Sequence, residues 1–196
     1  MNIIMEKKLS KTIYDYIQIY NKKLSEEIVQ NLMKQIIDAL EYIHSNGIYI
    51  TELEDIGYLE NDSINLDNIL INFDSEIDKE NINLMNAKIK LINFKKAYKD
   101  SFDMKGPTYS SLSKYREKTI NFCIGKICYE LLTGKTPFKD NNIGKLCYFI
   151  PNNLSIEAIN FLNSTFQNSD KLRVSLKDIH KLDFLSKNIK DYTIYI

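Results

Sequence analysis

The chain has 196 residues, of which 44% are hydrophobic and 27% are charged, as in an ordinary globular protein. A chain of this length can bury one sizeable core, so we expect a single domain over residues 1–196. The 26 basic and 26 acidic side chains cancel, and no apolar run approaches the roughly 20 residues of a membrane span. Composition therefore argues against a membrane span and gives no reason to expect a nucleic-acid partner.

The N-terminal quarter of the chain is predicted to be helical. Residues 1–8 lack the apolar core of a secretory signal, so we expect an intracellular, cytoplasmic protein. Ser10 is a suitable N-cap for a first helix that runs to Lys23. A second helix is predicted from Ser25, which two glutamates follow, to Asn46-Gly47. Its apolar residues recur at helical spacing: Ile28, Leu32, Ile36, Leu40 and Ile43.

An acidic, irregular stretch between Glu52 and Asp67 comes next. Its carboxylates could hold a cation, but the stretch lacks the glycine and the alternating pattern of a calcium loop, so a solvated loop is favoured. Short apolar runs at residues 69–71 and 88–92 are typical of strands. They are predicted to form a hairpin with a long polar tip.

The second half of the chain begins with a basic segment. Residues 95–118 contain seven basic and three acidic side chains and the Gly106-Pro107 pair, so they are predicted to form a long surface loop. Such a loop could recruit an acidic partner or a phosphopeptide, but a solvated loop is favoured because isolated surface charges contribute little.

Three more helices are predicted after this segment. The apolar residues between Phe122 and Leu132 predict a buried helix that Gly134 closes. Ser155 is the predicted N-cap of the next helix, and Ser175 that of a last helix. The last helix is expected to carry three apolar residues, which are Ile179, Leu182 and Phe184.

The residues that most often bind metals give no sign of a metal site. The three cysteines, Cys123, Cys128 and Cys147, are odd in number and contain no Cys-x-x-Cys pair, which favours reduced thiols packed in the core. His44 and His180 have no histidine or cysteine at ligand spacing. Both are predicted to have structural or surface roles.

Four stretches, at residues 40–48, 67–71, 125–138 and 171–185, carry a family resemblance: in this order they resemble the large lobe of eukaryotic protein kinases. Residues 40–48 (LEYIHSNGI) resemble the helix end that leads into the catalytic loop, and residues 67–71 (DNILI) resemble the segment after it. Residues 125–138 (GKICYELLTGKTPF) resemble the central buried helix, and residues 171–185 resemble the closing segment. The resemblance runs from about residue 10 to 185, with short extensions at both ends. It implies a mainly α fold, a protein-kinase-like C-terminal lobe with a small β-hairpin and no N-terminal β-lobe.

The resemblance also places the catalytic positions of the family on this sequence. Glu52 stands where kinases have the catalytic aspartate, and Asn93 stands where they have the metal-binding aspartate of Asp-Phe-Gly. Asn68 matches the magnesium-binding asparagine, but it follows Glu52 by sixteen positions where the family has about five. Leu70 matches the residue that floors the adenine pocket, although packing under the long loops is favoured. These departures predict that Glu52, Asn68 and Asn93 are degenerate and that no residue is catalytic.

Three further positions have structural roles by the same resemblance. The family pairs an arginine at the position of Arg173 with the glutamate of Ala-Pro-Glu, a motif that is missing here, so Arg173 needs another acceptor. Phe94 and Gly134 match the phenylalanine of Asp-Phe-Gly and the exit of the buried helix. The face that contains Leu70, Phe94 and the Ile50 region is expected to be exposed unless residues 53–66 or another protein cover it.

The function that follows is that of a catalytically inactive, pseudokinase-like lobe. We expect it to act as a scaffold or allosteric regulator that binds a protein, with an active kinase as one candidate partner, and to need no cofactor or metal. The alternative is a fragment of a Ser/Thr kinase whose small lobe is missing from this chain, in which case Asn68 and Leu70 bind Mg and ATP. A degenerate remnant with no retained role is a third reading.

Overall fold

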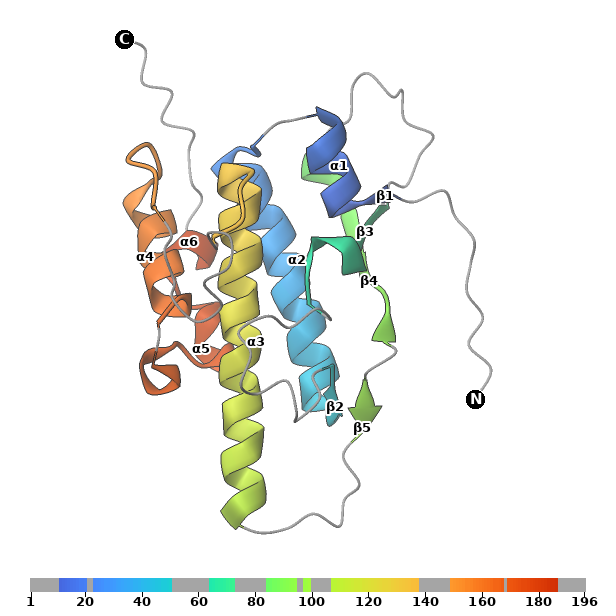
Figure 1. The fold of residues 1–196 in the computed structure, drawn as a ribbon, viewed down its shortest axis with the longest axis vertical. Helices are drawn as coiled ribbons and strands as arrows, with labels where there is room; N and C mark the ends of the chain where they lie inside the picture. The colour runs from blue at the N-terminus through green and yellow to red at the C-terminus, as the bar shows by residue number, and fades with distance from the viewer. Residues whose placement is uncertain are drawn as a thin grey trace.

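The computed structural model describes residues 11–20, 23–50, 64–72, 84–94, 97–99, 107–137, 149–167 and 169–186 (Figure 1). Its helices are α1 (Ile13–Tyr20), α2 (Glu26–Ser45), α3 (Pro107–Thr133), α4 (Ile156–Thr165), α5 (Leu176–Ile179) and α6 (Asp183–Ser186). Its strands are β1 (Lys11–Thr12), β2 (Ile48–Tyr49), β3 (Ile69–Asn72), β4 (Lys88–Leu91) and β5 (Tyr98–Lys99). Short 3-10 turns lie at Leu66–Asn68, Leu84–Asn86 and Asp170–Leu172.

Two long helices form the centre of the molecule. Helices α2 and α3 pack against each other, with α4, α5 and α6 on one side of the pair and the strands on the other (Figure 1). The stripe predicted for α2 meets this core, because Leu32, Ile36 and Leu40 are all buried. Burying each such side chain contributes on the order of 1.5–3 kcal/mol, so this stripe is a main source of stability for α2.

Local hydrogen bonds set the ends of the first two helices. The N–H of Thr12 donates to Asp15 and the N–H of Asp15 donates to the Thr12 hydroxyl, both at 3.1 Å, which is a reciprocal capping arrangement. Helix α1 therefore begins at Ile13, and the cap predicted at Ser10, which lies outside the described residues, is wrong. Helix α2 follows the prediction: Ser25 is its N-cap, and Gly47 beyond its end has φ +68.

The predicted hairpin is confirmed. Strand β3 pairs with β4 in antiparallel register, with Ile69 opposite Leu91 and Ile71 opposite Ile89, and β4 packs against α2. Two pairings were not predicted: β1 adds to the free edge of β3, and β2 pairs with β5. The Gln35 amide, on α2, donates to the carbonyl of Ala87 and accepts from the N–H of Ile89. Helix α2 therefore fixes both the face and the outer edge of the hairpin.

Helix α3 differs from the prediction at its start. It begins at Pro107 and has 27 residues, a length of about 40 Å, so the segment 95–118 is not one long loop. Gly106-Pro107 was interpreted as a breaker, but proline is favoured in the first turn of a helix, where its missing N–H has no partner to lose. The predicted end is correct: Gly134 has φ +67 and its N–H bonds the carbonyl of Glu130 at 2.8 Å.

Helix α4 is fixed to both long helices. Ser155 is its N-cap, as predicted, and the Glu26 carboxylate at the start of α2 accepts from the N–H of Ser155 at 2.7 Å and from its hydroxyl at 2.5 Å. Further along, α3 and α4 approach so closely at Gly125 that a Cβ there would lie 2.4 Å from the Thr165 hydroxyl oxygen. Gly125 is thus required by contact rather than by backbone conformation.

The last predicted helix is two short helices. Ser175 caps α5, as expected, but the chain turns at residues 180–182, where the N–H groups of Lys181 and Leu182 bond the carbonyls of Asp178 and Ile179. Ile179 in α5 and Phe184 in α6 are both fully buried on either side of this turn. None of the helices in the described part of the chain is long and apolar enough to cross a bilayer.

Candidate functional site

Asn68 and Asn93, 25 positions apart in sequence, meet at one end of the hairpin. The 3-10 turn places Asn68 directly before β3, and Asn93 follows β4 after one residue. The Asn93 amide donates from Nδ2 to Oδ1 of Asn68 at 3.1 Å. The N–H of Ile92 also donates to the carbonyl of Asn68 at 2.9 Å, which continues the β3–β4 pairing to the site. The strand register therefore brings the two amides together.

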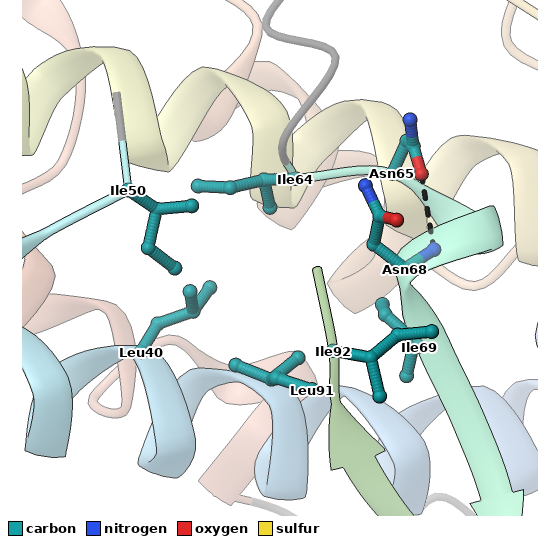
Figure 2. A pocket seen from close by; sticks show the side chains of 8 residues that line it. All are labelled: Leu40, Ile50, Ile64, Asn65, Asn68, Ile69, Leu91 and Ile92. Carbon is teal, nitrogen blue, oxygen red and sulfur yellow. Dashed lines mark hydrogen bonds between the residues drawn. The ribbon is translucent and has the colours of Figure 1, made fainter. Parts of the chain in front are cut away.

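Asn65 anchors the turn that carries Asn68. Its Oδ1 accepts from the N–H of Asn68 at 3.1 Å, the bond drawn in Figure 2. Asn68 is only 8% exposed. Its N–H donates to Asn65, its carbonyl accepts from the N–H of Ile92, and its Oδ1 accepts from Asn93. The position of Asn68 is thus fixed by the fold and does not depend on a ligand.

Asn93 has an unusual backbone conformation. Its φ of 64° lies in the left-handed region, and among the described residues it is the one non-glycine residue with a positive φ. Asparagine tolerates this region better than most residues, because its short polar side chain can bond locally. The bond that the Asn93 side chain makes to Asn68 is not local, because the two residues are 25 positions apart. Phe94, next in sequence, is 43% exposed.

A small apolar cavity lies beside Asn68. Six aliphatic side chains line it together with Asn65 and Asn68 (Figure 2): Leu40, Ile50, Ile64, Ile69, Leu91 and Ile92. Its volume is about 10 Å³, roughly the space of one water molecule. Ligand pockets are commonly some 300–1,000 Å³, so this cavity is too small for a nucleotide.

The face that contains Leu70, Phe94 and the Ile50 region was expected to be exposed unless residues 53–66 or another protein cover it. Ile50 is only 5% exposed and lines the cavity, so the Ile50 region is buried. One of its neighbours in the cavity is Ile64, which belongs to the segment 53–66; residues 53–63 lie outside the described part of the chain. Leu70 is half-buried and lies opposite Lys90 in the sheet, on the face that points away from the core. Of the residues predicted for the site, Glu52 lies outside the described residues.

Glu130 is the ionisable group of this region that the sequence analysis missed. Burial raises the pKa of its carboxyl to about 7; Lys126, one turn earlier on α3, opposes the shift, and the negative charge of Asp67 adds to it. The signal was present in the sequence, because Lys126 and Glu130 are the charged residues within the apolar run of α3. Asp67 precedes Asn68, so Glu130 influences the same end of the hairpin.

The predicted structural residue Arg173 has two backbone acceptors. Its Nε donates to the carbonyl of Gln167 at 2.7 Å and an Nη donates to the carbonyl of Lys118 at 3.1 Å. The guanidinium also lies over the ring of Phe122, 4.9 Å from its centre. These contacts fix the segment before α5 against α3.

The histidines and cysteines have structural surroundings. The His44 ring meets Tyr49 edge-on at 5.1 Å, and His180 lies 3.4 Å from Asp38 and 3.3 Å from Glu41. Cys123 and Cys128 are buried free thiols, as predicted, and burial raises the pKa of Cys128. Cys147 lies outside the described residues. Within the described ranges, no group of three or more His, Cys, Asp or Glu residues is arranged to hold a metal ion.

Comparison with known proteins identifies the family of this chain. The family model of the protein kinase domain matches residues 1–185. The chain belongs to the protein kinase family. Its fold also matches the crystal structure of the Rad53 kinase domain and SCD2, with a TM-score of 0.65 and 20% identity, over 90% of this chain and 63% of that one. The mainly helical protein-kinase-like fold predicted from the four stretches is therefore correct.

Two curated relatives are named as kinases. The SNF1-related protein kinase catalytic subunit alpha KIN12 of Arabidopsis thaliana is 26% identical over 97% of this chain and 37% of its own length. Sperm motility kinase 2B of Mus musculus is 24% identical over 90% of this chain and 36% of its own length. The chain thus spans little more than a third of the length of these relatives.

Proposed function

We propose that this chain is a pseudokinase-like C-terminal lobe that transfers no phosphate and acts by binding a protein. The observation that carries the proposal is the hydrogen bond between Asn93 and Asn68. In protein kinases the aspartate of Asp-Phe-Gly and the asparagine of the catalytic loop hold magnesium on the nucleotide phosphates. At the corresponding positions this chain has two neutral amides that bond each other.

Electrostatics supports inactivity at this site. Magnesium is bound through hard, usually anionic oxygens, and replacing a carboxylate with an amide removes the charge that attracts it. The Oδ1 of Asn68 already accepts a hydrogen bond from Asn93, so binding a metal there would first require breaking that bond. The nearby Glu130 does not restore the missing charge in full, because its raised pKa of about 7 leaves it partly protonated at neutral pH.

The proposed binding role rests on the parts of a kinase that this sequence lacks and on two side chains near the hairpin. The 196 residues contain no Gly-rich phosphate loop and no Val-Ala-Ile-Lys strand, the parts with which kinases cover ATP. The described helices and hairpin fit the large lobe, so we propose that residues 10–185 form this lobe as a single domain in the cytoplasm. Leu70 is half-buried and Phe94 is 43% exposed, and we propose that these two side chains belong to the surface that a partner covers. The proposed partner is a protein, with an active kinase as the first candidate.

A second candidate is an active Ser/Thr kinase fragment completed by a small lobe from elsewhere. The names of the relatives favour it, as does the retention of Asn68 in a fixed position at the site. In this reading Asn68 holds magnesium, Leu70 floors the adenine and Glu52 replaces the catalytic aspartate.

A thermal-shift titration with Mg-ATP separates the two candidates. A ligand at a hundred times its dissociation constant stabilises the native state by about 2.7 kcal/mol, which is readily measured. We expect no saturable shift for the wild-type chain. Asn93→Asp restores the carboxylate, and Asn86→Asp, at an exposed position on the hairpin's 3-10 turn, makes the same charge change away from the site.

A saturable wild-type shift with Mg-ATP would contradict the proposal, and so would phosphate transfer that Glu52→Ala abolishes. Gain of magnesium-dependent ATP binding in Asn93→Asp but not in Asn86→Asp would support the view that the amide is what excludes the metal. The binding role is tested with the same chain and a purified protein kinase by isothermal titration. Failure to bind any kinase tried would remove the first candidate partner.

A further inference from the structure

We draw no further inference here: the strongest candidate, the highly exposed apolar side chains of Ile156 at the start of α4 and of Phe149 in the segment before it, carries no proposal because nothing in the described part of the structure shows what covers them.

Discussion

Replacing Glu130 with glutamine should stabilise the protein at alkaline pH. Burial raises the pKa of this carboxyl from 4.5 to about 7, so the folded state holds its proton more tightly than the unfolded state does. Because one pKa unit corresponds to about 1.4 kcal/mol, this shift lowers the free energy of unfolding by about 3 kcal/mol once Glu130 is ionised.

The direction of the pH dependence follows from the same shift. Below pH 4.5 the carboxyl is protonated in both states and there is no penalty. Between pH 4.5 and about 7 the folded state binds more protons, so the free energy of unfolding falls as pH rises. Above about pH 7 the full penalty applies. Glutamine has no charge to bury, so Glu130→Gln removes this slope.

Urea unfolding at pH 5 and pH 8 measures the effect. We expect Glu130→Gln to exceed wild type by about 1–3 kcal/mol at pH 8, where the penalty applies in full, and by much less at pH 5. Glu27→Gln, which removes an exposed carboxyl from α2, is the matched control and should keep the wild-type slope. Equal stability of Glu130→Gln and wild type at both pH values would refute the reasoning.

At three other contacts, the proposed substitutions are expected to lower the stability of the protein. Gly125→Ala places a Cβ 2.4 Å from the Thr165 hydroxyl and should lower stability by about 1–3 kcal/mol in urea unfolding; an unchanged midpoint would mean that α3 and α4 are not so close. Glu26→Gln and Ser155→Ala should each lower the free energy of unfolding by about 1–2 kcal/mol. Because both remove the same contact, the double mutant should lose less than the sum of the two single losses, and full additivity would contradict that contact. Arg173→Lys should cost about 1–2 kcal/mol, since lysine cannot reach both carbonyls with fixed N–H groups, and a neutral result would assign Arg173 a surface role.

Local patterns explain why much of the fold could be predicted. Ser25, Ser155 and Ser175 act as N-caps through bonds to N–H groups three residues ahead, so a few letters suffice to place each helix start. The start of α3 failed because Pro107 fits both a turn and a first helical turn, and only the tertiary fold decides between them.

Non-local pairing explains most of the remaining differences. The two-residue strands β1, β2 and β5 have no pattern of their own and exist because a distant strand lies beside them. The last helix is divided by the turn at residues 180–182, on both sides of which the chain enters the core. Neither feature can be predicted from a short stretch of sequence.

The candidate site, too, could be predicted from the sequence only in part. The spacing of the family motifs placed Asn68 and Asn93 at the site, and the register of β3 with β4 explains why they meet. Their direct hydrogen bond could not be predicted, because it joins the side chains of two residues that are 25 positions apart. The shifted pKa of Glu130 depends on burial against residues from other elements, which sequence does not give.

Paramagnetic broadening by Mn²⁺ tests the central claim most directly. Mn²⁺ prefers the same oxygen ligands as magnesium and broadens the NMR signals of nearby groups. With ATP and Mn²⁺ added to the wild-type chain, the side-chain amide signals of Asn68 and Asn93 should stay as sharp as that of Asn86 on the same hairpin. Selective, saturable broadening of the Asn68 and Asn93 amides would mean that the pair holds a metal nucleotide and would contradict the account.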